Sequence, residues 1–217
     1  MKKAFFLTLI IFCFNTAKSQ WGITFTPSVV SLHSGYIGVQ FGANYTFNSR
    51  WDMVTELTTT VGEKNDPSVS NQQYFRVKPE LRYYLSKRQA NAGAYTGIQL
   101  SYASRSWKVG EGSYFEDRLF EDSAITFTSA SVRSPVYTSS AQIGSLIAIG
   151  KHWCIDFFFG AGVRIIDTKY SDVQNKGKTY AARPNCKIMF SPDPAWRVNG
   201  TITRPHFNLG MRFIYRL

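Results

Sequence analysis

Residues 153–165 read Trp-Cys-Ile-Asp-Phe-Phe-Phe-Gly-Ala-Gly-Val-Arg-Ile, and their side chains alternate in character with a period of two. The odd-numbered positions are all apolar, whereas the even-numbered positions include Asp156, Arg164 and two glycines. Because successive side chains of a β-strand point to opposite sides, this stretch predicts a strand with one apolar face and one partly charged face.

The same alternation recurs in seven further segments, so the pattern extends over most of the chain. These segments are residues 21–29, 37–47, 51–61, 75–85, 94–105, 137–149 and 207–217. After residue 20, no apolar run approaches the roughly 20 residues of a membrane-spanning helix. Segments of about ten alternating residues separated by turns are typical of a transmembrane β-barrel. The sequence therefore predicts an all-β fold, an eight-stranded antiparallel barrel. The strand count stays open at residues 125–131 and 187–190, which either extend hairpins above the membrane or add a pair of strands.

A soluble β-sandwich also alternates, so the composition of the polar face has to distinguish the two folds. A sandwich would turn that face to water and enrich it in lysine, but here it carries arginine, glycine and charges of both signs. Glycine fits a narrow barrel interior, and arginine with carboxylates fits a paired interior network. The predicted interior network comprises Asp52, Glu56, Arg76, Lys78, Glu80, Arg82, Arg105, Asp156, Arg164 and Arg212.

The connections between the predicted strands differ in length on the two sides of the barrel. Residues 48–50, 86–91 and 150–152 form short turns, whereas residues 63–73, 107–136 and 168–203 form long loops on the opposite side. Short periplasmic turns and long extracellular loops are expected of a bacterial outer-membrane barrel. In that orientation Trp21, Trp51 and Trp153 each open an outward-running strand, which predicts an aromatic girdle at the periplasmic interface.

The first nineteen residues predict a cleaved Sec signal peptide, which leaves residues 20–217 as the barrel. Lys2 and Lys3 precede an apolar run over residues 4–14, and Ala17 and Ser19 place small residues at the cleavage site. The run is too short for a membrane anchor. Export and barrel together predict localisation in the outer membrane.

The composition limits the chemistry that the chain could perform. Lysine and arginine outnumber aspartate and glutamate by 25 to 14, but the excess falls in outer loops and the interior, so nucleic acid is not expected as a partner. The chain has three cysteines and three histidines without the spacing of a metal site, so no metal and no cofactor are expected. Cys154 and Cys186 remain after cleavage and are interpreted as two thiols without a disulfide framework.

The chain resembles the small outer-membrane barrels of the OmpA/OmpX type. Its last seven residues look like the signal read by the outer-membrane insertion machinery, with alternating apolar side chains at Met211, Phe213, Tyr215 and Leu217. The usual last residue is Phe, so Leu217 departs from that pattern. The stretches Pro79-Glu80-Leu81-Arg82-Tyr83-Tyr84-Leu85 and Gly93-Ala94-Tyr95-Thr96-Gly97 are similar to an uncharacterised barrel family common in Bacteroidota. This resemblance implies fold and location, but no activity.

Three functions remain open from the sequence. The first is a non-enzymatic scaffold or surface-interaction role, with loops of net charge −2 (residues 107–136) and +4 (residues 168–203) that pack on each other or contact lipopolysaccharide phosphates or an envelope protein. The second is a narrow channel or a lateral path for small apolar solutes, because eight strands leave an interior that side chains fill. The third is a hydrolase or acyltransferase using His206, His33 or Asp167, although no motif links these residues. Asp122-Ser123-Ala124 additionally looks like an O-glycosylation site, with Ser123 as acceptor.

Overall fold

The computed structural model describes residues 20–30, 36–60, 69–85, 92–116, 123–180 and 197–217, and twelve β-strands account for nearly all of them. Their bounds are β1 Gln20–Val30, β2 Tyr36–Thr46, β3 Trp51–Thr60, β4 Val69–Tyr84, β5 Gly93–Val109, β6 Gly112–Glu116, β7 Ser123–Phe127, β8 Ser129–Arg133, β9 Val136–Ile149, β10 Trp153–Gln174, β11 Gly177–Tyr180 and β12 Val198–Arg216. No helix in these ranges is long and apolar enough to cross a membrane.

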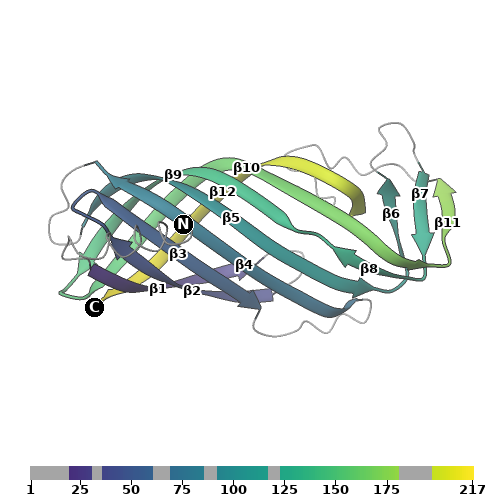
Figure 1. Cartoon of the computed structure of the whole chain (residues 1–217), viewed down its shortest axis with the longest axis horizontal. Coiled ribbons are helices and arrows are strands. Elements are labelled where there is room, and N and C mark those ends of the chain that lie inside the picture. The colour runs from purple at the N-terminus through teal and green to yellow at the C-terminus, as the bar shows by residue number, and fades with distance from the viewer. Residues whose placement is uncertain (1–19, 31–35, 61–68, 86–91, 117–122, 181–196) are drawn as a thin grey trace, which may run out of the picture.

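Eight of the described strands close into a ring, as the sequence predicted (Figure 1). Each of β1, β2, β3, β4, β5, β9, β10 and β12 pairs with the next in an antiparallel sense, and β12 pairs back with β1. A sheet that closes on itself has the geometry of a β-barrel and leaves no free edge along the closed part.

The closing pair is the shortest in the ring. Between β1 and β12 the register runs only from Gly22↔Arg216 to Phe25↔Phe213. On its other side, β12 pairs with β10 from Trp153↔Tyr215 to Thr168↔Gly200. The wall formed by β10 and β12 is therefore continuous far beyond the point at which β1 separates from β12.

The predicted loops 107–136 and 168–203 are wrong over much of their length, because strands continue through them. β5, β10 and β12 extend past the predicted strand ends, and β6, β7, β8 and β11 lie beyond the ring (Figure 1). β8 lies in line with β9 and pairs with β5 and β10, so it lengthens the wall without adding a ring strand. The segment 187–190, which the sequence left open as an additional strand, lies outside the described residues.

This outer part, called the extension below, comprises β6, β7, β8 and β11 with residues 104–109, 167–174 and 198–203. It holds two apolar clusters of its own, formed by Val109, Tyr114, Phe127, Ala130 and Val132, and by Phe115, Ala124, Val198 and Ile202. Of these strands the sequence left open only residues 125–131, which fall in β7 and β8. It missed the rest because outward positions such as Ser104, Lys169 and Ser171 are polar, so the apolar alternation stops at the end of the ring.

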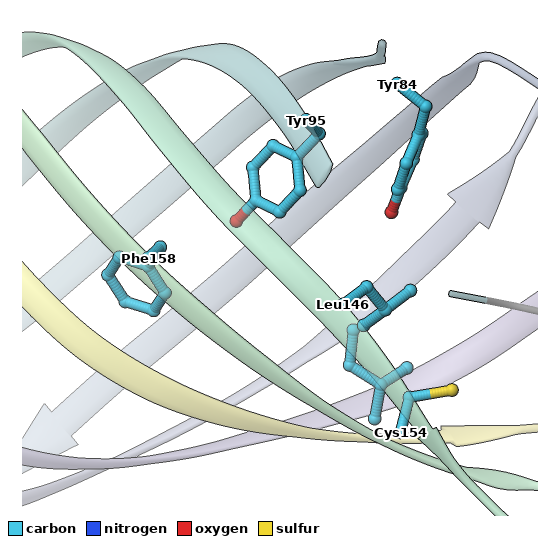
Figure 2. Close-up of a cluster of buried hydrophobic side chains, with 6 residues drawn as sticks. Tyr84, Tyr95, Leu146, Cys154 and Phe158 are labelled. Atoms are coloured by element: carbon cyan, nitrogen blue, oxygen red, sulfur yellow. The ribbon is translucent and has the colours of Figure 1, made fainter. Parts of the chain in front are cut away.

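An apolar layer fills the ring at the end that carries the turns 47–50 and 150–152, called the turn end below. Its side chains come from five strands and are Tyr84, Tyr95, Leu146, Cys154, Phe158 and Ile214 (Figure 2). The expectation of a polar interior is therefore wrong at this end. Two inward-facing glycines make room for the rings, since a Cβ at Gly144 would collide with Tyr95 and a Cβ at Gly210 with Phe158.

Candidate functional site

The ring exposes apolar side chains on its outer surface and buries charged side chains inside, which is the reverse of a soluble protein. Large apolar side chains are exposed on its outer surface, with Leu209 84% and Ile143 63% exposed. The charged side chains of Glu56, Arg82 and Arg212 face the interior and are 0% exposed. The candidate site is therefore the interior, where charged groups are held out of contact with water.

Arg212 of β12 lies at the centre of an ionic network in this interior. Its Nε and Nη2 donate to the two carboxylate oxygens of Glu56 on β3 over 2.8 and 2.9 Å. Nη2 also donates to Glu80 on β4 over 3.0 Å, and Nη1 donates to Asp156 on β10 over 2.7 Å. One guanidinium thus connects three carboxylates from three other strands.

Two further cations complete the network. Arg82 donates to Glu80 and to Asp156, both over 2.6 Å, and Lys78 lies 2.5 Å from Glu56. The three carboxylates Glu56, Glu80 and Asp156 are thereby matched by the three cations Lys78, Arg82 and Arg212. Buried charges are stable only when they are paired and hydrogen-bonded, and these six groups meet that condition.

Aromatic and hydroxyl groups hold the network in place. The Tyr95 hydroxyl donates to Asp156 over 2.9 Å, while the Arg82 guanidinium lies over the Tyr95 ring at 4.4 Å from its centroid. The Thr26 hydroxyl donates to Glu56, and Arg212 lies over the Phe158 ring at 4.9 Å. Arg82, Arg212 and their carboxylates are at most 1% exposed, so these charged groups lie out of contact with water beside the apolar layer.

The other four predicted network residues lie elsewhere in the interior. Asp52 accepts from the Tyr84 hydroxyl over 3.0 Å, close to the turn end. Arg105 donates to the carbonyl and hydroxyl oxygens of Ser134 near the extension. Arg164 is hydrogen-bonded to His206. Arg76 forms no hydrogen bond or ion pair with Glu56, Glu80 or Asp156. The structure thus brings together six of the ten predicted residues.

The three predicted girdle residues lie exposed at the turn end, where each contacts a tyrosine on a neighbouring strand. The ring centroids are 4.8 Å apart for Trp21 and Tyr45, 5.0 Å for Trp51 and Tyr83, and 5.0 Å for Trp153 and Tyr215. Sequence reasoning missed these tyrosines, each of which the strand register places directly opposite its tryptophan.

The sequence also missed the interior aromatic groups that support the network. Tyr84, Tyr95 and Phe158 occupy inward positions of their strands, so residue parity alone contained the signal. These three aromatic residues were not identified from the sequence, because apolar side chains were assigned to the outer face and polar ones to the interior.

The remaining predicted residues are placed as follows. Met211, Phe213 and Tyr215 share the outward side of β12, and Leu217, one residue beyond its end, is 71% exposed. Cys154 carries a buried thiol, whereas Cys186 lies outside the described residues. Ser123 begins β7, but its side chain is not among those described. In the described ranges, no three His, Cys, Asp or Glu side chains gather as a metal site would require.

The histidine and aspartate considered for catalysis have partners other than a nucleophile. His206 contacts Arg164 through Nδ1 over 2.7 Å. Asp167 accepts from the Thr201 hydroxyl over 3.3 Å and lies 3.5 Å from Lys169. His33 lies outside the described residues.

Comparison with known proteins adds little to this geometry. No protein-family model matches the chain, and no curated protein matches it in sequence. The solved structure of a major outer membrane protein from Thermus thermophilus is similar to it over 93% of this chain and 100% of that chain, with 9% sequence identity and a TM-score of 0.38.

Proposed function

We propose that the chain is an integral outer-membrane β-barrel with a sealed interior, which acts as a scaffold or surface-interaction protein through its extension. The observation that carries this proposal is the inverted polarity of the ring. Soluble proteins rarely expose large contiguous apolar patches, whereas here exposed apolar side chains occur on all eight ring strands. Hydrocarbon is the solvent that suits such a surface.

The height of the apolar surface supports the same proposal. Outward apolar residues run from Trp153 to Ile165 on β10 and from Phe207 to the last residue along β12. Toward the extension the outward positions turn polar, at Asp167 on β10 and at Thr203 on β12. A tilted transmembrane strand needs about 9–11 residues, which these stretches supply. The Trp–Tyr pairs then lie at one rim, where amphipathic rings favour a membrane interface.

The extension supports a role at the cell surface. It continues the wall of β5, β10 and β12 beyond the apolar surface and is packed by its own core, in which Tyr114 and Tyr170 stack at 4.2 Å. Burial raises the pKa of both tyrosine hydroxyls, so both remain neutral at physiological pH. A packed projection of this kind is a platform on which an envelope protein or lipopolysaccharide can bind.

The proposal includes several points that rest on the sequence. These are the cleaved signal peptide, the relation to OmpA/OmpX-type barrels and to a Bacteroidota family, and recognition of the last strand by the insertion machinery. It also includes a non-enzymatic role, which is supported by the pairing of His206 with an arginine instead of a nucleophile.

A second candidate function is a lateral path for small apolar solutes. It is favoured by an apolar groove of about 360 Å³ on the outer surface, across β4, β5, β9 and β10. Val77, Pro79, Leu100, Val163 and Ile165 contribute to its lining. The groove faces the side that we assign to lipid, and it would accommodate an acyl chain.

The experiment that tests the proposal is fractionation of the native host combined with electrophoresis with and without boiling. We expect the protein in the outer-membrane fraction, with faster migration before boiling than after it. Recovery in the soluble periplasmic fraction without a mobility shift would contradict the proposal. Open-channel conductance of the purified protein in planar bilayers would contradict the sealed interior and favour a channel.

A further inference from the structure

Three arginines and one histidine face the interior on the side of the ionic network that is nearer the extension. Arg76 lies on β4, Arg164 on β10, and Arg204 and His206 on β12, where Arg164 and Arg204 are directly paired in the register. The positive charge of Arg76 acts on both Arg164 and His206, and that of Arg204 acts on Arg164. These side chains from three strands therefore form one cluster, called the arginine cluster below.

The hydrogen bond inside the cluster determines the state of His206. Arg164 Nη2 lies 2.7 Å from His206 Nδ1, and a guanidinium nitrogen can only donate. Nδ1 is therefore the acceptor, and the neutral ring carries its proton on Nε2. His206 is only 8% exposed, and its Nε2 has no hydrogen-bond partner among the described residues.

Arg164 contributes a second buried donor without an acceptor in the described part of the chain. Its Nε is shielded from water and has no partner there. Opposite Arg76, on β3, the buried Thr58 hydroxyl also has none. Burying a hydrogen-bond donor without an acceptor is costly. The unpartnered donors of His206, Arg164 and Thr58 therefore indicate that a ligand with acceptor atoms binds beside them.

The charges of Arg76 and Arg164 are not balanced by the groups described around them. The six members of the ionic network neutralise one another, and among the described residues no carboxylate is hydrogen-bonded or ion-paired with Arg76 or Arg164. Arg76 and Arg164 are half-buried and so partly withdrawn from water. Their unbalanced charge is therefore unfavourable, and a bound anion reduces that cost.

We propose that the arginine cluster binds a small oxyanion, a carboxylate or a phosphate, inside the extension half of the ring. Arg76, Arg164 and Arg204 supply charge and forked donors that match oxyanion geometry, while His206 donates through Nε2. The oxyanion has two sources, a soluble ion or the headgroup of an anionic amphiphile such as a fatty acid. Both present the same oxygen atoms to the same donors.

Calorimetric titration of the purified full chain in a non-ionic detergent, at constant ionic strength, tests this site with inorganic phosphate, acetate and decanoate as probes. We expect saturable binding that Arg76→Gln and Arg164→Gln each weaken by about tenfold or more, since each removes a charge-assisted contact. Arg133→Gln is the matched control, because it removes an exposed guanidinium in β8 and should leave binding unchanged. Decanoate binding far above acetate indicates an amphiphile, and equal binding indicates a soluble ion.

Two results would overturn the site. The first is no saturable binding of phosphate, acetate or decanoate to the wild-type chain. The second is binding that all three arginine variants retain equally. Because a variant can fail to fold, nitrogen NMR of the wild-type chain supplies an independent readout: the His206 Nε2–H resonance should shift on titration with the bound probe, and an unchanged resonance also contradicts the site.

Discussion

Arg212 bonds three carboxylates from three strands while it is fully buried. We expect Arg212→Met to lower the free energy of unfolding by about 3–5 kcal/mol, because it leaves Glu56, Glu80 and Asp156 with only two cations. Urea unfolding in detergent, followed by tryptophan fluorescence, measures this change. Arg133→Met at an exposed site should cost less than about 0.5 kcal/mol. Equal effects of the two substitutions would mean that water reaches the network.

Gly210 is a second residue whose effect can be isolated, because its missing side chain leaves space for the Phe158 ring. We expect Gly210→Ala to destabilise the barrel by about 1–3 kcal/mol through overpacking. Adding Phe158→Leu should recover part of that loss, so the two substitutions should be strongly non-additive in urea unfolding. Additive effects would show that the ring does not occupy this space.

Residue parity in the sequence could predict which charged side chains face inward, but not which of them meet. Glu56, Glu80 and Asp156 are far apart in the chain, and their common contact with Arg212 depends on how the sheet closes. Tyr84, Phe158 and Ile214 also stand at inward positions by parity, but the apolar layer was not identified from the sequence, because a polar interior was expected throughout.

At the scale of elements, the ring strands were predictable because each has an apolar outward face. The extension was not, since its strands have polar outward positions and are stabilised by partners distant in sequence, as in the stacking of Tyr114 on Tyr170. Alternation of polarity identifies a strand only where one face meets an apolar solvent or core.

The direction of the strands gives a prediction at this scale. The turn 150–152 and the tip between β10 and β11 lie at opposite ends of the fold (Figure 1). In a background without Cys154 and Cys186, a cysteine at Lys176 should react with an impermeant maleimide on intact cells. A cysteine at Lys151 should react only after the outer membrane is opened. Labelling of Lys151→Cys alone on intact cells would invert the orientation.

For the whole molecule, the sealed interior that we propose predicts that the protein does not conduct ions. The apolar layer and the ionic network together close the turn-end half of the ring, with Arg82, Arg212 and Tyr84 fully buried. Liposomes that contain the purified protein should therefore retain a small trapped dye as well as protein-free liposomes do. Arg212→Met, which loosens this layer, should increase leakage if its barrel remains folded. Rapid leakage from liposomes with the wild-type protein would contradict a closed ring.

The central claim is that the apolar outer surface of the ring meets lipid, and nitroxide scanning of residues 139–143 in β9 tests it most directly. Residues 139, 141 and 143 face outward, whereas residues 140 and 142 are buried inside. In lipid vesicles, we expect relaxation by oxygen to peak at the three outward positions and relaxation by a water-soluble nickel complex to stay low there. High accessibility of these three positions to the nickel complex would show that this surface faces water, which would contradict the membrane barrel.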